Sequence, residues 1–404
     1  MRGGFSRDVQ VVSAIVALGL VLDVTLDRIL PYSSLRQLFL LAFCNVVTAV
    51  SLNAINGVAG QFSIGHAGFV GIGAYTAAIV ASNLHDATGG GDPTFARSLF
   101  IVPPAVVAAA SLAGAFGFLV GLPSLRLKGD YLAIVTLGFA EIFRLVVATA
   151  TLGEPETIGH ALGEVGGPHG VLGPIAHVFS VLIASLGGQN GYAGSDRRGV
   201  PAYAGPFWIL GGTALVVLLA LRLKFSGWGR AVRALREDEI AAAAVGVDPT
   251  RYKVSSFVLA AAGGGVAGAL LALMRDGAPI VQPDSFGFQA SFDAITMVIL
   301  GGSGSVSGAV LGGVFVTFTV KAIEEAESAR FILALREHFE WLDLNAIRMI
   351  LYASVLIGLM IARPAGLLGE KELFGIGARG RRSRAGGGGP GEPGSSGPPL
   401  AAAS

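Results

Sequence analysis

The sequence predicts an all-α polytopic integral membrane protein, and three observations support this class. The 404-residue chain is 52% apolar and only 14% charged, whereas soluble domains carry roughly 25% charged residues. Its mean hydropathy is +0.67, and apolar segments of membrane-crossing length recur along most of its length. Many of its 60 glycines lie inside those segments, where small residues let helices pack closely.

Apolar segments of suitable length are candidate membrane crossings, because a helix needs about 20 residues to cross the hydrocarbon core. In chain order they are residues 9–22, 35–55, 63–81, 99–122, 131–152, 206–221, 254–274, 288–320 and 345–361. The first is short and follows basic residues, but it has no clear cleavage site, so we expect it to be retained. The run 288–320 is too long for one crossing and contains GGSGSVSG, which predicts a broken or re-entrant helix pair. We therefore expect about 8–10 transmembrane helices.

Lys and Arg residues in short loops predict the orientation, because such residues concentrate on the cytoplasmic side. The loop 222–253 is strongly basic, and the loop around Arg126 and Lys128 is basic as well, so we expect both inside. The acid-rich stretches 153–205 and 321–344 are expected outside. This orientation predicts cytoplasmic N- and C-termini.

The same reasoning predicts the domain organisation. Residues 1–374 form a transmembrane domain, with 222–253 as a cytoplasmic loop and 153–205 as an outer-face loop. Because the number of crossings must agree with the orientation, residues 171–186 are expected to form an interfacial helix rather than a crossing. The Gly/Pro/Arg-rich tail 375–404 has no apolar periodicity and is expected to be disordered.

The loop 222–253 carries a helical pattern that a simple turn does not need. Trp228, Val232 and Leu235 line one stripe of a helix expected over 228–244, and a second stripe is charged. This pattern predicts a docking element for a soluble partner, with the apolar stripe in a groove of the partner and the charged stripe at its rim. Gly246 is expected to end the helix in the left-handed conformation. The predicted coupling residues are Trp228, Arg230, Val232, Arg233, Leu235, Arg236, Glu237, Glu239 and Gly246.

The motifs of an enzyme are missing from the sequence. There is no GxxxxGK[ST], so the chain cannot hydrolyse ATP by a P-loop mechanism. The sequence GGGVAG at 263–268 lies inside an apolar segment, which favours helix packing over nucleotide binding. The six histidines form no cluster, Cys44 is the single cysteine, and the net charge is +1. We therefore expect no catalytic residues, no cofactor, no metal and no nucleic acid.

A glycine-rich segment, NGVAGQFSIGHAGFVGIGAY at 56–75, brings polar groups to the start of a predicted crossing. Polar groups at membrane depth usually face protein or a water-filled path, so one interpretation is a translocation path for a polar or zwitterionic substrate. The other is a close-packed helix crossing with a polar cap, in which His66 is a hydrogen-bonded packing residue. The path residues of the first interpretation are Asn56, Gly57, Gly60, Gln61, Ser63, Gly65 and His66.

Glu141 is a further candidate, because an intramembrane carboxylate is costly unless it is paired or hydrated. It is spaced i, i+3 from Arg144. Two interpretations remain: a polar element of the translocation path, or a local ion pair near the outer interface.

Several segments resemble one family when they are taken together. They are NGVAGQFSIGHAGFVGIGAYTAA at 56–78, LPSLRLKGDYLAIVTLGFAEIFRLV at 122–146, GRAVRALREDEIAAAAVGVDPTRYKVSSFVLAAAGGGVAGAL at 229–270, ITMVILGGSGSVSGAVLGG at 295–313, and RPAGLLG at 363–369. The chain is similar to the LivM-type permease subunits of branched-chain amino acid ABC importers. The resemblance leaves residues 175–205 and the tail without a counterpart.

The resemblance implies a permease subunit, not an enzyme, that forms half of a translocation pore for branched-chain or similar hydrophobic amino acids. It implies a bacterial cytoplasmic (inner) membrane location and pairing with a second, related permease in a heterodimer. It also implies two cytoplasmic ABC ATPase subunits, which bind the ATP, and a periplasmic or extracellular amino-acid-binding protein. Residues 229–246 would be the loop that docks on the ATPase. Three alternatives remain: a urea, short-amide or aromatic-acid ABC permease, a secondary carrier working alone, and a membrane enzyme.

Overall fold

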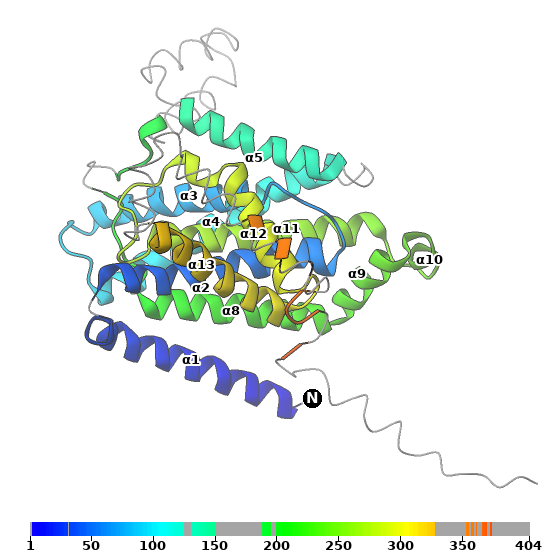
Figure 1. Cartoon of the computed structure of the whole chain (residues 1–404), viewed down its shortest axis with the longest axis horizontal. Helices are drawn as coiled ribbons and strands as arrows, with labels where there is room; N and C mark the ends of the chain where they lie inside the picture. The colour runs from blue at the N-terminus through cyan, green and yellow to red at the C-terminus, as the bar shows by residue number, and fades with distance from the viewer. Residues whose placement is uncertain are drawn as a thin grey trace, which may run out of the picture. The chain divides into compact units, whose positions relative to one another are not determined.

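The computed structural model describes residues 2–30, 32–124, 131–149, 188–194 and 199–327, with 353–354, 357–358, 361, 366–369 and 372–373. The long helices of this part, shown in Figure 1, are α1 (Arg2–Ile29), α2 (Ser33–Asn53), α3 (His66–Ala87), α4 (Phe95–Ser124), α5 (Tyr131–Thr149), α8 (Pro206–Phe225), α9 (Gly227–Glu237), α10 (Glu239–Ala244), α11 (Pro249–Ala272), α12 (Phe288–Gly301) and α13 (Val306–Glu327). Short helices are η1 (Ala54–Val58), η2 (Gly188–Asn190) and η3 (Pro283–Phe286). In the described part, β pairing is limited to the isolated bridges Tyr192–Val281 and Ala204–Met274.

Seven of the described helical segments are long and apolar enough to cross a membrane. They are Ser33–Val58, His66–Ala87, Phe95–Pro123, Tyr131–Thr149, Pro206–Phe225, Pro249–Ala272 and Val306–Ile323. Each coincides with a predicted crossing, so the all-α polytopic membrane class is confirmed. The first predicted crossing lies in α1, whose apolar part is the short stretch Ala17–Leu26. The last one, at 345–361, lies largely outside the described residues.

Glycines bring the central helices into backbone contact. A side chain at Gly268 of α11 would overlap the Val70 carbonyl of α3, and one at Gly265 would lie 2.6 Å from the Ala109 carbonyl of α4. Such close approach is open only to residues without a Cβ. The GGGVAG sequence is therefore a helix-packing motif, as predicted.

The predicted break in the run 288–320 separates α12 from α13. Gly302 and Gly304 have φ of 117° and 88°, a conformation that side chains other than glycine rarely adopt. The 14 residues of α12 span about 21 Å, which is shorter than a full crossing. The two helices pack on each other through Gly301 and Gly308, whose backbones leave no room for a Cβ. This is the expected broken helix pair.

At one end of the bundle, α2 ends and α9 begins. In Figure 1, α9 and α10 lie at this end, beyond the ends of α8 and α11. All of these helices belong to one compact unit, Met1–Glu372. The predicted interfacial helix at 171–186 and the predicted tail at 375–404 lie outside the described residues.

Candidate functional site

The loop 222–253 folds as two helices rather than one. The Ser226 hydroxyl accepts a hydrogen bond from the Gly229 amide and caps α9, as serine does at helix N-termini. Asp238 then takes an extended conformation with φ −151°, and its carboxylate caps α10 by accepting from the amides of Ile240 and Ala241 at 2.9 and 3.0 Å. The single helix expected over 228–244 is therefore wrong, because a capping aspartate interrupts it.

Gly246 ends α10 as the sequence predicts. Its φ is 90°, and its amide donates to the Ala243 carbonyl at 3.0 Å. A glycine in this conformation satisfies the last carbonyls of the helix without the penalty that a Cβ would bring.

The apolar stripe of α9 is used inside the chain. Val232 and Leu235 are only 2% and 7% exposed. Val232 packs with Val58, Ala59 and the partly buried Trp228 and Tyr252, and the Trp228 indole donates to Ser255 Oγ at 3.0 Å. Since these side chains are already buried, Val232 and Leu235 cannot fill a groove of another protein. The orientation expected for the two stripes therefore needs correction.

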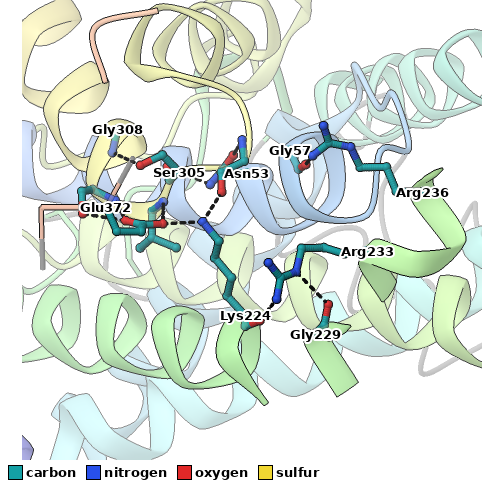
Figure 2. Close-up of polar contacts among 12 residues, drawn as sticks. Asn53, Gly57, Lys224, Gly229, Arg233, Arg236, Ser305, Gly308 and Glu372 are labelled. Carbon is teal, nitrogen blue, oxygen red and sulfur yellow. Dashed lines mark hydrogen bonds and ion pairs between the residues drawn. The ribbon is translucent and has the colours of Figure 1, made fainter. Parts of the chain in front are cut away.

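Arg236 of α9 reaches the glycine-rich segment. Arg236 Nη1 donates to the Gly57 carbonyl at 2.7 Å (Figure 2). A Cβ at Gly60, which has φ 67°, would lie 2.7 Å from Arg236 Cγ. The tertiary structure thus places one predicted coupling residue directly against two predicted path residues.

A cationic cavity lies between α9, the end of α8, Val58 of η1 and Gly304 of the α12–α13 break. Its volume is about 400 Å³, and its charged lining residues are Lys224, Arg230, Arg233, Arg236 and Glu237. Arg233 donates to the carbonyls of Gly229 and Lys224 at 3.3 and 3.4 Å. Because backbone carbonyls carry no net charge, these contacts leave the guanidinium charge in place.

Two large apolar side chains are exposed in and just after α10. Ile240 is 83% exposed and Val245 is 81% exposed, although both are large and apolar. Glu239 is held by Lys253 at 2.5 Å. Neither Ile240 nor Val245 was among the predicted coupling residues. Both lie in the run EIAAAAVGV at 239–247, where they are the bulky apolar side chains among small residues, together with Val247.

Between the end of η1 and the start of α3, the glycine-rich segment forms a closed loop, residues 59–65. The Asn56 side chain spans it, donating to the Ser63 carbonyl at 3.1 Å and accepting from the Ser63 amide at 3.0 Å. A Cβ at Gly65 would overlap the backbone of Thr136 in α5. These residues fix the shape of the loop, so Asn56, Ser63 and Gly65 support it from within.

Gln61 differs from its neighbours. The residue is 7% exposed, yet neither its Oε1 nor its Nε2 has a hydrogen-bond partner within the described part of the chain. An unsatisfied buried amide is costly, so such groups usually meet a water molecule or a ligand. Gln61 is the path residue whose geometry leaves a polar group available.

His66 is a packing residue at the start of α3. It is 2% exposed, and its Nε2 lies 2.8 Å from Ser51 Oγ of α2. A Cβ at Gly264 would lie 3.1 Å from its ring. Of the two interpretations given for His66, the structure supports the hydrogen-bonded packing residue.

Glu141 of α5 lies at the start of α12. One carboxylate oxygen pairs with Arg144 at 2.8 Å, and the other accepts from the Phe288 amide at 3.0 Å, which caps α12. Arg144 also pairs with Asp284 at 2.9 Å. The local ion pair predicted from the i, i+3 spacing is confirmed, and Glu141 is not brought together with the other path residues.

A buried polar node joins the break of the α12–α13 pair to the end of α8 (Figure 2). The Gly304 amide donates to Asn53 Oδ1 at 2.9 Å, and Asn53 Nδ2 donates to the Ser305 carbonyl at 3.0 Å. Lys224 Nζ contacts the Gly304 carbonyl and Glu372 Oε1, both at 2.5 Å. None of Asn53, Lys224 and Glu372 was predicted as a site residue.

The pKa of Glu372 is lowered by its partners. Burial alone would raise this pKa, but hydrogen bonds from Lys224, the Ser307 hydroxyl and the amides of Ser307 and Val306 favour the charged form and prevail. The carboxylate is therefore ionised at neutral pH, and the node holds one positive and one negative charge.

Comparison with known proteins gives a consistent set of relatives. Residues 34–366 match the protein family described as "Branched-chain amino acid transport system / permease component". The chain is 34% identical over 332 residues to the high-affinity branched-chain amino acid transport system permease protein LivM of Salmonella typhimurium, covering 80% of this chain and 67% of the relative. Identity to LivM of Escherichia coli is 33% over the same shares.

A second group of relatives is more distant. The permease protein LivH of Escherichia coli is 31% identical over 166 residues, which is 41% of this chain and 47% of LivH. No solved structure matches.

Proposed function

The chain belongs to the branched-chain amino acid transport system permease family, and from this premise we propose that it forms half of the pore of an ATP-driven importer. The proposed substrates are branched-chain or similar hydrophobic amino acids, which the names of its LivM and LivH relatives specify. The proposed location is the bacterial inner membrane, with both termini in the cytoplasm. The similarity to both LivM and LivH supports pairing with a second, related permease.

Two further partners complete the proposed importer. Two cytoplasmic ATPase subunits supply the energy, since the sequence has no P-loop of its own. An amino-acid-binding protein on the outer face delivers the substrate. The permease then needs only a weak, transient path, because a binding protein supplies most of the affinity.

The contact between Arg236 and Gly57 carries the proposal. It joins α9, which lies at the end of the bundle, to η1, directly before the loop that leads into α3. A movement of α9 that breaks or shifts this contact changes the loop directly. We therefore propose that ATP-driven closure of the partner subunits moves α9, and that the glycine-rich loop follows.

The surface that meets the ATPase is proposed to lie on α10 and on the outer side of α9. Ile240 and Val245 supply the apolar contact, and the exposed residues Arg230, Glu237 and Glu239 of α9 and α10 supply charged ones. Burial of an exposed Ile or Val side chain contributes about 1.5–3 kcal/mol, so two such residues suffice as an anchor.

Gln61 is the proposed polar contact along the path. Its two unsatisfied amide atoms offer one acceptor and two N–H donors, which suit the ammonium and carboxylate of a zwitterion. Asn56, Ser63 and Gly65 hold the loop in shape around it.

Reconstitution of the whole complex tests the proposal. The permease pair, the ATPase subunits and the binding protein are placed in proteoliposomes, and uptake of radiolabelled leucine is measured with and without ATP. We expect uptake that requires ATP and that excess isoleucine or valine inhibits. Uptake by the purified chain without ATP would instead identify a carrier working alone, and inhibition only by urea, amides or aromatic acids would reassign the substrate.

A further inference from the structure

The carboxylate of Glu372 closes the start of α13. It accepts hydrogen bonds from the Val306 amide at 2.8 Å, the Ser307 amide at 2.9 Å and the Ser307 hydroxyl at 2.6 Å. The first amides of a helix have no partner within the helix itself, and negative charge there is favourable. Glu372 therefore caps α13 from a position 65 residues further along the chain.

The same carboxylate holds the end of α8. Its Oε1 lies 2.5 Å from Lys224 Nζ, and the two side chains are only 9% and 8% exposed. Lys224 is in the last turn of α8, two residues before Ser226 caps α9. The Lys224 carbonyl also accepts from Arg233 of α9 at 3.4 Å. The pair therefore connects α13 to the base of α9.

Residues 366–369 contact the α12 side of the break between α12 and α13. The amides of Leu367 and Leu368 donate to the carbonyls of Leu300 and Gly301 at 2.8 and 3.2 Å, and these are among the last carbonyls of α12. A Cβ at Gly366 would lie 2.6 Å from Gly302. Leu367 and Leu368 thus satisfy the end of α12, and Glu372 satisfies the start of α13.

We propose that Glu372 and Lys224 are positioning residues that join the α12–α13 break to α9, so that α9 and the broken helix pair move as one unit during transport. This inference rests on the proposed function. An uncharged oxygen can accept hydrogen bonds from Val306 and Ser307, whereas the attraction to Lys224 requires the charge on Glu372. A buried ion pair gives little stability over an apolar pair but fixes one arrangement, which is the property that a mechanical connection requires.

The variant Glu372→Gln removes the charge of this side chain and keeps part of its cap on α13. With its one amide oxygen at the Oε2 position, Gln still accepts from the Ser307 amide and hydroxyl, while the contacts of Oε1 with Lys224 and the Val306 amide are lost. In the reconstituted complex we expect ATP hydrolysis to stay within about twofold of the wild type and leucine uptake per ATP to fall about tenfold. The measurements are the two rates, the amount of assembled complex and the melting temperature of the purified protein.

Two comparisons make the result specific. Asp276→Asn removes the half-buried pair with Arg36 at 3.0 Å, at the opposite end of α2, and should leave uptake per ATP unchanged. The double variant Lys224→Met with Glu372→Gln should lose no more coupling than Glu372→Gln alone, because the two residues act through one contact.

Each outcome decides the question. Normal uptake per ATP in Glu372→Gln would overturn the inference, and so would a loss of uptake that only follows a loss of assembled complex. A wild-type complex without ATP-dependent uptake would instead refute the proposed function, so the two failures are distinguishable.

Discussion

At the scale of single residues, the exposure of the side chains at the site differs from what the sequence pattern predicts. Val232 and Leu235 look like a docking stripe but are buried in their own chain, whereas Ile240 and Val245 are apolar and exposed. Gln61 is buried without a partner within the described residues. Burial, rather than residue type, decides which of these side chains is available to another molecule.

The first prediction concerns Ile240 and Val245. Replacing both with Ser removes the proposed apolar anchor, and we expect the ATPase subunits to bind at least about 100-fold more weakly, because each side chain contributes about 1.5–3 kcal/mol when buried. The check is a titration of the solubilised permease pair with ATPase subunits. The control is Thr250→Ala, an exposed position at the start of α11, and equal binding by both variants would refute the anchor.

At the scale of elements, glycines determine how closely helices approach. Gly268 lies against the backbone of α3, where a methyl group would overlap the Val70 carbonyl. Gly211 of α8 has nothing within 4 Å of the position where a Cβ would be placed. The two positions have the same residue type but opposite surroundings.

The second prediction follows from this pair. Gly268→Ala should destabilise the protein by about 1–3 kcal/mol, because backbone atoms cannot move aside as a flexible side chain would. Gly211→Ala should be neutral or stabilise by about 0.5–1 kcal/mol, since Ala restricts the unfolded chain more than Gly. The melting temperatures of the two purified variants are the measurement, and a drop in melting temperature for Gly211→Ala equal to that for Gly268→Ala would contradict the argument.

At the scale of the whole molecule, one end of the bundle gathers groups that are far apart in the chain. Gly57, Lys224, Arg236, Gly304 and Glu372 are linked there by hydrogen bonds or an ion pair. The arginines and lysine at this end are those that predict a cytoplasmic orientation. The loop between α3 and α4 lies at the opposite end of α3 and is therefore expected outside.

The third prediction tests this orientation with single cysteines in a Cys44→Ala background. Asp92→Cys, in the loop before α4, should react with a membrane-impermeant maleimide in intact cells. Ala244→Cys, at the end of α10, should react only after the cells are permeabilised. Both positions are exposed, so lack of reaction reports the side of the membrane, and the reverse labelling pattern would invert the proposed topology.

Much of the fold could be predicted because it depends on local chemistry. Apolar length sets the crossings, and the positive φ of Gly302 and Gly304 explains why a glycine-rich run breaks the helix pair. The helix end at Gly246 and the pair of Glu141 with Arg144 also follow from short-range spacing. Asp238 was the local signal that the prediction missed, since an aspartate can cap a second helix as readily as it can lie within one.

The sequence by itself thus determined the class of the protein, most of its crossings and its resemblance to a permease family. Only the tertiary structure decided that Arg236 meets Gly57, that Val232 is buried, and that Glu372 reaches Lys224 across 148 positions of the chain. The physical reason is the range of the interactions. Hydropathy, capping and glycine conformation act within a few residues, whereas the partner of a buried charge is set by which helices pack together.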